Sequence, residues 1–206
     1  MRMLRNSWLC CSLLAPTMLA SACDTASTDD QPTLEARVLV GEVDGTDIVL
    51  GALVDGDRFA VYQCGGDQTV ETHTDWFRGE FDGDAFDIEE QGLRLTGTRS
   101  VDGLDGELIE ADGTRHSFHI DPVEDDDEAG VYISSEGGLS TGVVVLPGSD
   151  GLVAQGASCR EPDECFQVII LAPLTIANQQ IAGQVLVDGS TVDLEVSRTL
   201  VAPDGV

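Results

Sequence analysis

Nine Asp-Gly pairs divide this 206-residue chain into short segments. They stand at 44–45, 55–56, 82–83, 102–103, 105–106, 112–113, 150–151, 188–189 and 204–205. Asp-Gly favours two-residue hairpin turns because both residues can adopt positive φ there, and the resulting twist matches that of the flanking strands. The chain also contains 23 glycines, which disfavour long helices. The pairs therefore predict a series of β-hairpins.

Between the turns, apolar and polar residues alternate with a period of two, as in the segments 34–43 and 46–54. No helical apolar stripe runs through the chain without a Gly or Pro inside it. We expect strands at about 35–43, 47–54, 58–64, 69–81, 84–90, 92–99, 104–111, 114–120, 131–135, 141–147, 152–158, 166–174, 180–187 and 190–199. Short strands at this spacing predict an all-β fold, an antiparallel meander of Asp-Gly hairpins that forms a barrel or a sandwich.

The β-rich part spans residues 34–206, with an acidic run inside it at 121–128. The part before this run is rich in Asp-Gly, and the part after it is more apolar. Two subdomains that meet near 121–130 are one interpretation. A single closed meander is the interpretation that we prefer.

The first 22 residues have the layout of an export signal. Arg2 and Arg5 are followed by an apolar stretch from Trp8 to Ala22, which is shorter than the roughly 20 residues that a membrane-spanning helix needs. The sequence Leu19-Ala20-Ser21-Ala22-Cys23 resembles the bacterial lipobox, although Leu is commoner at the position of Ala20. The resemblance implies that Cys23 becomes the first residue of the mature chain and carries a diacylglycerol thioether. Simple secretion, with Cys23 as an ordinary thiol, is the alternative.

Residues 23–33 would then be the lipidated cysteine and a flexible tether, since 24–33 are small, polar and aperiodic. We expect the protein to be exported and anchored by lipid to a membrane of the bacterial cell envelope. Asp24 follows the lipobox cysteine, and in enteric bacteria an aspartate there retains a lipoprotein in the inner membrane. Other lineages sort differently, so both membranes stay open.

The charge balance excludes several classes of partner. The chain has 38 Asp and Glu against 10 basic residues, all of them arginine, and a formal net charge of −28. Removal of Arg2 and Arg5 with the signal makes the mature charge −30. Nucleic acid needs clusters of Lys and Arg, and anionic lipid repels such a surface. High net charge favours a soluble monomer, which is the state we expect.

Three cysteines follow Cys23 in the chain. Cys159 and Cys165 lie six residues apart between two expected strands, and exported proteins meet an oxidising compartment. We expect a disulfide between this pair. Cys64 would then be a free thiol, buried among apolar neighbours and not a nucleophile.

The three histidines give one candidate site. Glu71, His73 and Asp75 would share one face of the strand expected at 69–81, where the carboxylates could bind a cation or raise the pKa of the imidazole. A solvated polar strand face is the plainer interpretation. His116 and His119 are three residues apart, so they would point to opposite faces. We assign no catalytic residue and no bound cofactor from these patterns.

Six carboxylates fall within eight residues of the acidic run: Asp121, Glu124, Asp125, Asp126, Asp127 and Glu128. Hard cations such as Ca²⁺ bind several such oxygens, which makes this segment a possible cation loop. It lacks the spacing and central glycine of an EF-hand loop. A charged, solvated connection between strands is the alternative.

Aromatic residues are unevenly distributed, and six of the nine beyond residue 22 lie between 59 and 86. They form a possible binding patch: Phe59, Tyr62, Trp76, Phe77, Phe81 and Phe86. Adjacent residues of a strand point to opposite faces, so Trp76 and Phe77 require either two covered faces or one exposed ring. Packing in the core is the alternative to a contact patch.

The chain resembles small bacterial lipoproteins of uncharacterised function, and the specific resemblance is confined to the signal and lipobox in residues 1–23. We expect a membrane-anchored, non-enzymatic module that binds an envelope protein or glycan, or that has a structural role in the cell envelope. A small β-barrel that carries an apolar ligand is the first alternative. The second is a hydrolase, which would need His73 or His119 in a cleft beside a carboxylate and a nucleophile.

Overall fold

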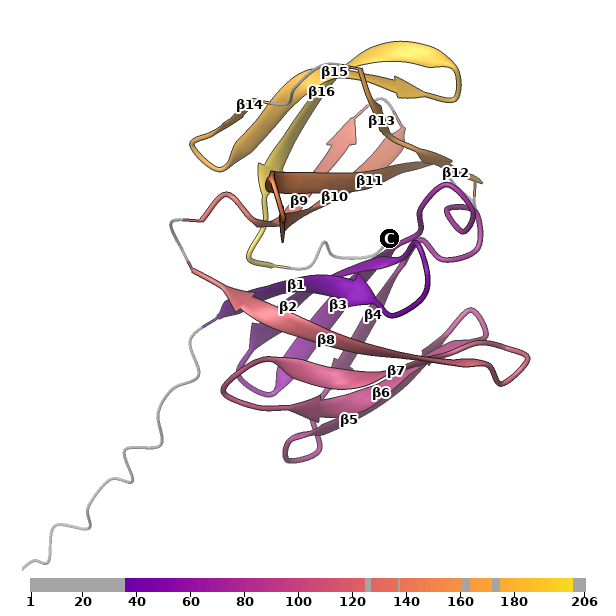
Figure 1. Cartoon of the computed structure of the whole chain (residues 1–206), viewed down its shortest axis with the longest axis vertical. Coiled ribbons are helices and arrows are strands. Elements are labelled where there is room, and N and C mark those ends of the chain that lie inside the picture. Colours follow the sequence, from indigo (N-terminus) through magenta and orange to yellow (C-terminus); the bar gives the residue numbers. More distant parts are fainter. Residues whose placement is uncertain (1–35, 125–126, 137, 161–163, 172–174, 202–206) are drawn as a thin grey trace, which may run out of the picture. The chain divides into compact units, whose positions relative to one another are not determined.

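The computed structural model of this chain describes residues 36–201, except 125–126, 137, 161–163 and 172–174. These residues form sixteen β-strands in two antiparallel sheets (Figure 1). The all-β prediction is confirmed, but the preferred single closed meander is wrong, because the strands form two sheets. None of the described residues forms a helix of the length and hydropathy that a membrane span requires. The predicted signal and the tether lie outside the described residues.

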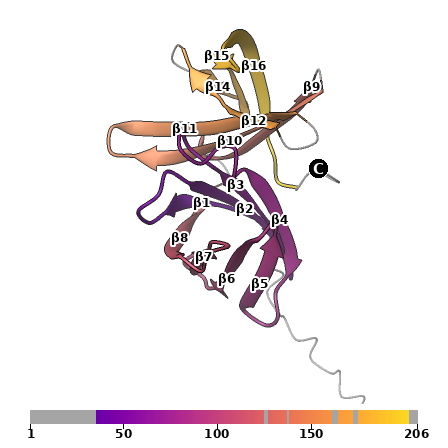
Figure 2. The same cartoon turned by 90° about the vertical axis from the view of Figure 1, so that its right-hand side faces the viewer.

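The N-terminal sheet contains the first eight strands. They are β1 (Arg37–Val43), β2 (Val49–Asp55), β3 (Arg58–Cys64), β4 (Asp75–Glu80), β5 (Ala85–Glu90), β6 (Leu93–Arg99), β7 (Leu104–Ile109) and β8 (Arg115–Val123). Their order in the sheet is β4-β3-β2-β1-β8-β7-β6-β5. The two outermost strands, β4 and β5, are joined by one tight connection with a bridge between Asp82 and Ala85. The sheet therefore curls until its ends meet, as Figure 2 shows.

The C-terminal sheet repeats this scheme with the next eight strands. They are β9 (Gly130–Glu136), β10 (Leu139–Gly148), β11 (Gly151–Arg160), β12 (Glu164–Gln167), β13 (Ile169–Ile170), β14 (Thr175–Ala177), β15 (Gln180–Val187) and β16 (Ser190–Arg198). Here β9 pairs with both β10 and β16, as β1 pairs with both β2 and β8. The successive strands β12 and β13 pair with β11 and β15 respectively, which links the two sides of the sheet. Both sheets are thus nearly closed, barrel-like meanders.

The Asp-Gly pairs mark the connections between strands. In seven of the eight pairs that the structure describes, the glycine has positive φ. Only Asp188-Gly189 has positive φ at both residues, at 48° and 69°. The eighth glycine, Gly106, lies inside β7, where an added Cβ would come 2.4 Å from the carbonyl oxygen of Thr96. This pair is therefore a close contact between strands and not a turn.

Most expected strands agree with the structure, but the one expected at 69–81 is wrong in its first half. The one expected at 166–174 is interrupted, since β12 ends at Gln167 and β13 covers only Ile169 and Ile170. Residues 67–73 form turns, and β4 begins only at Asp75. The carbonyl oxygen of Thr69 accepts hydrogen bonds from the backbone N–H groups of Thr72 and His73, and the Thr69 hydroxyl accepts one from Gly66 N–H. These local bonds replace a strand ladder. The short strand β14 was not expected.

The N-terminal sheet buries apolar side chains on both of its faces. Phe59 and Val61 of β3 point into the interior of the sheet, whereas Ala60, Tyr62 and Cys64 pack on its outer face against the C-terminal sheet. This is why β2 is apolar along almost its whole length and buried from Val49 to Val54. The chain passes from one sheet to the other between Val123 and Gly130.

The two sheets approach each other closely at two glycines that lie in the contact between them, Gly51 and Gly142. A Cβ added to Gly51 of β2 would lie 2.3 Å from Cγ2 of Val131 in β9. A Cβ added to Gly142 of β10 would lie 2.4 Å from Cζ of Tyr62. Gln155 of β11 joins the sheets directly, because its Nε2 donates to the carbonyl oxygens of Asp47 and Cys64, both at 2.8 Å.

Arg99, at the end of β6, holds two hairpin turns together. Its guanidinium donates to the carbonyl oxygens of Gly56 at 2.6 Å and Gly83 at 3.1 Å. It also donates to Asp57 and Asp84 in the same two turns. The turns that follow β2 and β4 are therefore fixed to each other at one end of the N-terminal sheet.

We expect Gly51→Ala to lower the free energy of unfolding by about 1–3 kcal/mol, because an overpacked core must shift to admit the added methyl group. Urea denaturation followed by circular dichroism measures this change. Glu195→Ala, at an exposed position of β16, is the control and should change stability by less than about 0.5 kcal/mol. A Gly51→Ala protein as stable as this control would show that the two sheets do not pack as described.

Candidate functional site

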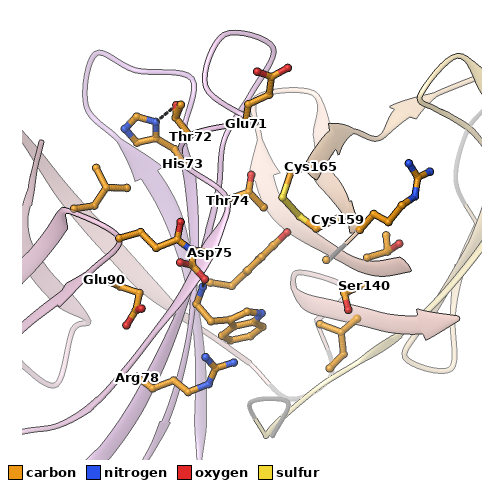
Figure 3. A pocket seen from close by; sticks show the side chains of 18 of the residues that line it. Glu71, Thr72, His73, Thr74, Asp75, Arg78, Glu90, Ser140, Cys159 and Cys165 are labelled. Atoms are coloured by element: carbon orange, nitrogen blue, oxygen red, sulfur yellow. Dashed lines mark hydrogen bonds between the residues drawn. A yellow bond between two sulfur atoms is a disulfide. The ribbon is translucent and has the colours of Figure 1, made fainter. Parts of the chain in front are cut away.

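A cleft of about 950 Å³ opens beside β4 and extends to the C-terminal sheet. Its N-terminal wall comes from residues 71–78, from the turn between β5 and β6, and from the turn between β7 and β8. Its C-terminal wall comes from β9, β10 and the disulfide of β11 and β12. Figure 3 shows side chains from both walls directed into this space. The cleft thus lies where the two ends of the N-terminal sheet meet.

The lining combines many polar side chains with a larger apolar area. Hydroxyl groups come from Thr72, Thr74, Ser134, Ser135, Ser140 and Thr141. Carboxylates come from Glu71, Asp75, Glu90 and Glu110, and guanidinium groups from Arg78 and Arg160. Tyr62, Trp76, Leu93 and Ile133 supply apolar surface. Such a mixture can bind a ligand that both donates and accepts hydrogen bonds.

His73 connects two other residues of the cleft by hydrogen bonds. Its Nε2 lies 2.9 and 3.0 Å from the two carboxylate oxygens of Glu110, and its Nδ1 lies 2.8 Å from Oγ1 of Thr72. A carboxylate can only accept, so in the neutral imidazole the ring proton is on Nε2 and Nδ1 accepts from the Thr72 hydroxyl. The imidazole is buried, and the Thr72 side chain is exposed to the cleft.

The arrangement predicted for Glu71, His73 and Asp75 is wrong in its geometry, because these residues are not successive members of one strand face. All three nevertheless line the same cleft (Figure 3). The carboxylate that His73 contacts belongs to Glu110, 37 residues further along the chain.

The other two histidines point to opposite sides of β8, as expected. Nε2 of His116 lies 3.7 Å from Oε1 of Glu110 on the inner side. On the outer side, Nδ1 of His119 lies 2.7 Å from Asp105 and its Nε2 lies 3.3 Å from Asp121. The hydrogen bond with Asp105 raises the pKa of His119 above its ordinary value.

The six aromatic residues of the possible binding patch are all buried. Phe59, Phe81 and Phe86 pack with ring centroids 4.9–5.9 Å apart inside the N-terminal sheet, where Phe77 also lies. Tyr62 and Trp76 pack 5.1 Å apart between the two sheets. These six residues therefore pack in the core, and of the six only Tyr62 and Trp76 reach the lining of the cleft.

The acidic run is described in part, since Asp125 and Asp126 lie outside the described residues. Asp121 belongs to β8 and contacts His119. The guanidinium of Arg198 donates to the carbonyl oxygens of Glu124 and Asp127, so a cationic side chain already contacts this connection. Among the residues that the structure describes, no group of three or more His, Cys, Asp or Glu side chains is placed to hold a metal ion. Binding of Ca²⁺ here stays a prediction.

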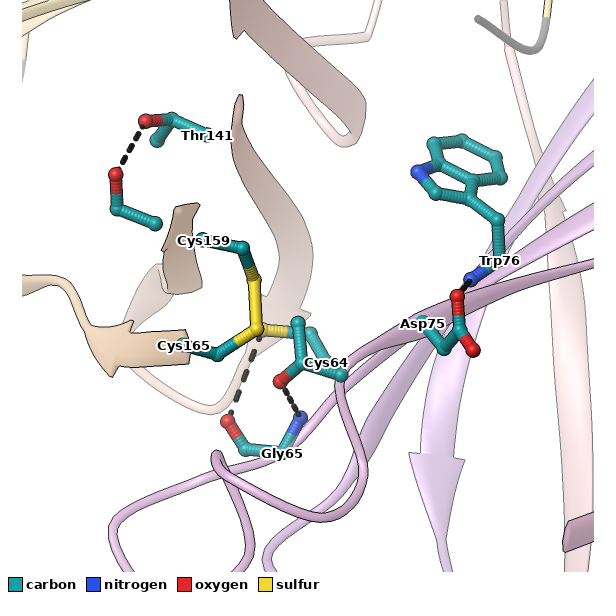
Figure 4. Close-up of a disulfide and its surroundings, with 9 residues drawn as sticks. Cys64, Gly65, Asp75, Trp76, Thr141, Cys159 and Cys165 are labelled. Carbon is teal, nitrogen blue, oxygen red and sulfur yellow. Dashed lines mark hydrogen bonds between the residues drawn. A yellow bond between two sulfur atoms is a disulfide. The ribbon is translucent and has the colours of Figure 1, made fainter. Parts of the chain in front are cut away.

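The predicted disulfide is present between Cys159 and Cys165, which also line the cleft (Figure 4). Cys64 is free and buried, as expected, and its thiol lies 3.7 Å from the carbonyl oxygen of Gly65. Burial raises the pKa of the Cys64 thiol to about 12. A thiol that stays protonated is a poor nucleophile, so the chemistry of the cleft does not depend on Cys64.

Two residues of the cleft, Glu110 and Thr72, were missed by the sequence interpretation. Glu110 continues the inward positions Leu104 and Leu108 of β7 by a further step of two residues. The period-two pattern could therefore have placed it on the inner face. Its pairing with His73 depends on the sheet order, which the pattern does not give. Thr72 had no signal beyond its position next to His73.

We expect Cys64 of the folded chain to resist the thiol reagent DTNB at pH 8 and to react fully in guanidinium chloride. Unfolding returns the thiol pKa to about 8.5, whereas folding holds it near 12. The neutral buried thiol therefore contributes stability that is complete below about pH 8.5 and is lost as the pH rises toward 12. Rapid reaction of the native chain would contradict the described burial.

Comparison of the chain with protein-family models, with curated proteins and with solved structures finds no match.

Proposed function

We propose that this protein is an exported lipoprotein of the bacterial cell envelope that binds a neutral glycan in the cleft beside β4. The single observation that carries the binding role is the cleft itself. Its volume of about 950 Å³ falls within the range of about 300–1,000 Å³ typical of ligand sites.

The chemistry of the lining supports a hydroxyl-rich ligand. Six serine and threonine side chains and four carboxylates line the space, and both kinds of group form hydrogen bonds with sugar hydroxyls. Carboxylates outnumber the two guanidinium groups, which disfavours an anionic ligand. The exposed edges of Tyr62 and Trp76 add apolar surface that can contact the C–H groups of a sugar.

The anchoring role rests on the sequence before the fold. The lipobox-like segment ends at Cys23, and the first strand begins at Arg37. The small polar residues between them suit a tether of about 35 Å when ten residues are fully extended. Such a tether would hold the binding cleft clear of the lipid headgroups.

We expect the full chain, expressed in a bacterium that is fed an alkyne-tagged fatty acid, to become labelled and to stay with the membrane after washing at high salt. Cys23→Ala should lose the label and the membrane association, because Cys23 would carry the lipid. Cys64→Ala is the matched cysteine control and should be labelled like the wild type. Labelling of Cys23→Ala at the wild-type level would contradict lipidation at this position.

Trp76 makes ligand binding directly measurable. It is the sole tryptophan beyond residue 22, so the fluorescence of the mature chain reports on the cleft. We expect titration with soluble neutral oligosaccharides from the envelope to shift this emission in a saturable way. Ser135→Tyr, which places a bulky ring in the cleft, should weaken the response. A wild-type emission unchanged by every oligosaccharide, with the fold intact, would contradict the glycan proposal.

The barrel carrier of an apolar ligand is the second candidate, and one observation favours it. A separate hollow of about 600 Å³ in the C-terminal sheet is lined mainly by aliphatic residues: Val145, Leu152, Ala154, Ile170 and Ile176, with Glu128 and Thr175. Leu152 and Ile170 are partly exposed there, at 43% and 38%. Saturable binding of a radiolabelled fatty acid that leaves the Trp76 emission unchanged would support this role over the first.

A further inference from the structure

We propose that Thr72, His73 and Glu110 form a hydrolytic site for carboxylic esters within this cleft. The inference deepens the proposed function, since it rests on the cleft as the ligand site and adds an acyl ester to the ligand. It departs from the expectation of a non-enzymatic module. A hydrolase of this kind needs a histidine in a cleft, beside a carboxylate and a nucleophile.

The three side chains form a continuous chain of hydrogen bonds. Oγ1 of Thr72 lies 2.8 Å from Nδ1 of His73, and Nε2 of His73 lies 2.9 Å from Oε2 of Glu110. Because the carboxylate accepts a hydrogen bond from Nε2–H, Nδ1 has a lone pair directed at the hydroxyl. A hydroxyl beside an imidazole that a carboxylate orients is the arrangement that activates a serine or threonine nucleophile.

The hydroxyl-bearing residue is the most exposed of the three, and the imidazole is the most buried. Thr72 is exposed on the wall of the cleft, where a substrate can reach its hydroxyl. His73 is 8% exposed, and the Glu110 side chain is 23% exposed. Partial removal of water strengthens the attraction between the carboxylate and the imidazolium that forms during the reaction. His116, 3.7 Å from Glu110, is the second imidazole at this carboxylate.

The loop between β3 and β4 holds Thr72 and His73 in place. Oδ1 of Asp47 accepts from the Thr69 hydroxyl at 2.6 Å, and its Oδ2 accepts from Gln68 N–H at 2.7 Å. The carbonyl oxygen of Thr69 then accepts from Thr72 N–H at 3.0 Å and from His73 N–H at 2.8 Å. A braced turn of this kind keeps the hydroxyl and the imidazole in one geometry.

The Thr72 hydroxyl also lies 3.3 Å from the carbonyl oxygen of Thr69. A hydroxyl has one proton to donate, and the shorter contact, to Nδ1 of a neutral imidazole, directs that proton toward the base. When His73 is protonated instead, Nδ1–H donates to Thr72, and the hydroxyl can donate to Thr69. Reaction at Thr72 therefore requires the neutral form of His73.

The reaction proceeds in two balanced steps. Oγ1 of Thr72 attacks the ester carbonyl carbon while its proton passes to Nδ1 of His73. The bond between that carbon and the alcohol oxygen breaks, and His73 returns the proton to the departing alkoxide. Water then attacks the acyl-threonine, its proton passing to His73, and the acid leaves as the Thr72 hydroxyl is restored. Glu110 takes no proton in either step and acts as a positioning residue.

The test uses the purified full chain in detergent with a fluorescent fluorophosphonate and with p-nitrophenyl acetate. We expect the fluorophosphonate to label Thr72, as identified by peptide mass spectrometry. Thr72→Val should abolish the label, and Thr72→Ser should keep it. His73→Gln should lower the esterase rate by about 10²–10⁴-fold, the usual contribution of a general base. Glu110→Gln should lower the rate and shift the acidic limb of its pH profile.

His119→Gln is the matched control, since His119 also contacts carboxylates but lies on the outer face of β8. It should keep the wild-type esterase rate. Thr72 is exposed, so Thr72→Val is expected to keep the wild-type melting temperature, which separates lost chemistry from lost folding. A wild-type chain without label at Thr72, or a Thr72→Val chain that hydrolyses the ester at the wild-type rate, would overturn the proposal.

The two proposals can fail separately. If Thr72→Val loses the label but retains the oligosaccharide response of Trp76, both the hydrolytic site and the glycan site stand. If the wild type responds to oligosaccharide but Thr72 is never labelled, the hydrolytic site falls and the binding role remains. If Thr72 is labelled but no oligosaccharide changes the emission, the ester proposal stands and the glycan proposal falls.

Discussion

The apolar layer between the two sheets is the contact on which the rest of the architecture depends. It joins Val49, Leu53 and Tyr62 of the N-terminal sheet to Val131 and Val144 of the C-terminal sheet. Burial of apolar surface contributes roughly 25 cal/mol per Å², and here it covers a face that would otherwise expose most of β2 and β3. Glycines at 51 and 142 allow the close approach, and Gln155 adds two hydrogen bonds across the layer.

The cleft is a consequence of the same layer. Tyr62 and Trp76 belong to the packed contact and also line the cleft, so one side of the site is fixed by the core. The disulfide fixes another part of the wall, and Asp47 braces the loop that presents Thr72 and His73. Polar side chains from both sheets therefore converge on one cleft.

The arginines of the described residues have a structural role as well. All eight within the described residues make a hydrogen bond, an ion pair or a ring contact. Arg99 and Arg198 stand at or near the ends of strands, and each donates to two backbone carbonyl oxygens of other segments. A fixed, planar group with five N–H donors suits this task better than lysine does, in agreement with the absence of lysine from the chain.

Local sequence patterns determined how much of the fold and of the cleft could be predicted. Asp-Gly pairs and period-two alternation located nearly all the strands, and the six-residue separation of Cys159 and Cys165 gave the disulfide. The strand expected through residues 69–74 was wrong because threonine hydroxyls and backbone carbonyls satisfy each other within that turn. The pairing of His73 with Glu110 could not be predicted, since alternation gives the face of a strand but not its neighbours. The order of strands is a property of the whole sheet.

In each sheet the first strand pairs with the last, β1 with β8 and β9 with β16. A chain that emerges from a ribosome or a membrane pore N-terminus first can thus complete its N-terminal sheet once Val123 is free. The outer face of β2 and β3 then stays uncovered until β9, β10 and β11 have emerged and packed on it. During that interval the incomplete molecule exposes the apolar outer face of β2 and β3. The speed of emergence then competes with the speed of aggregation.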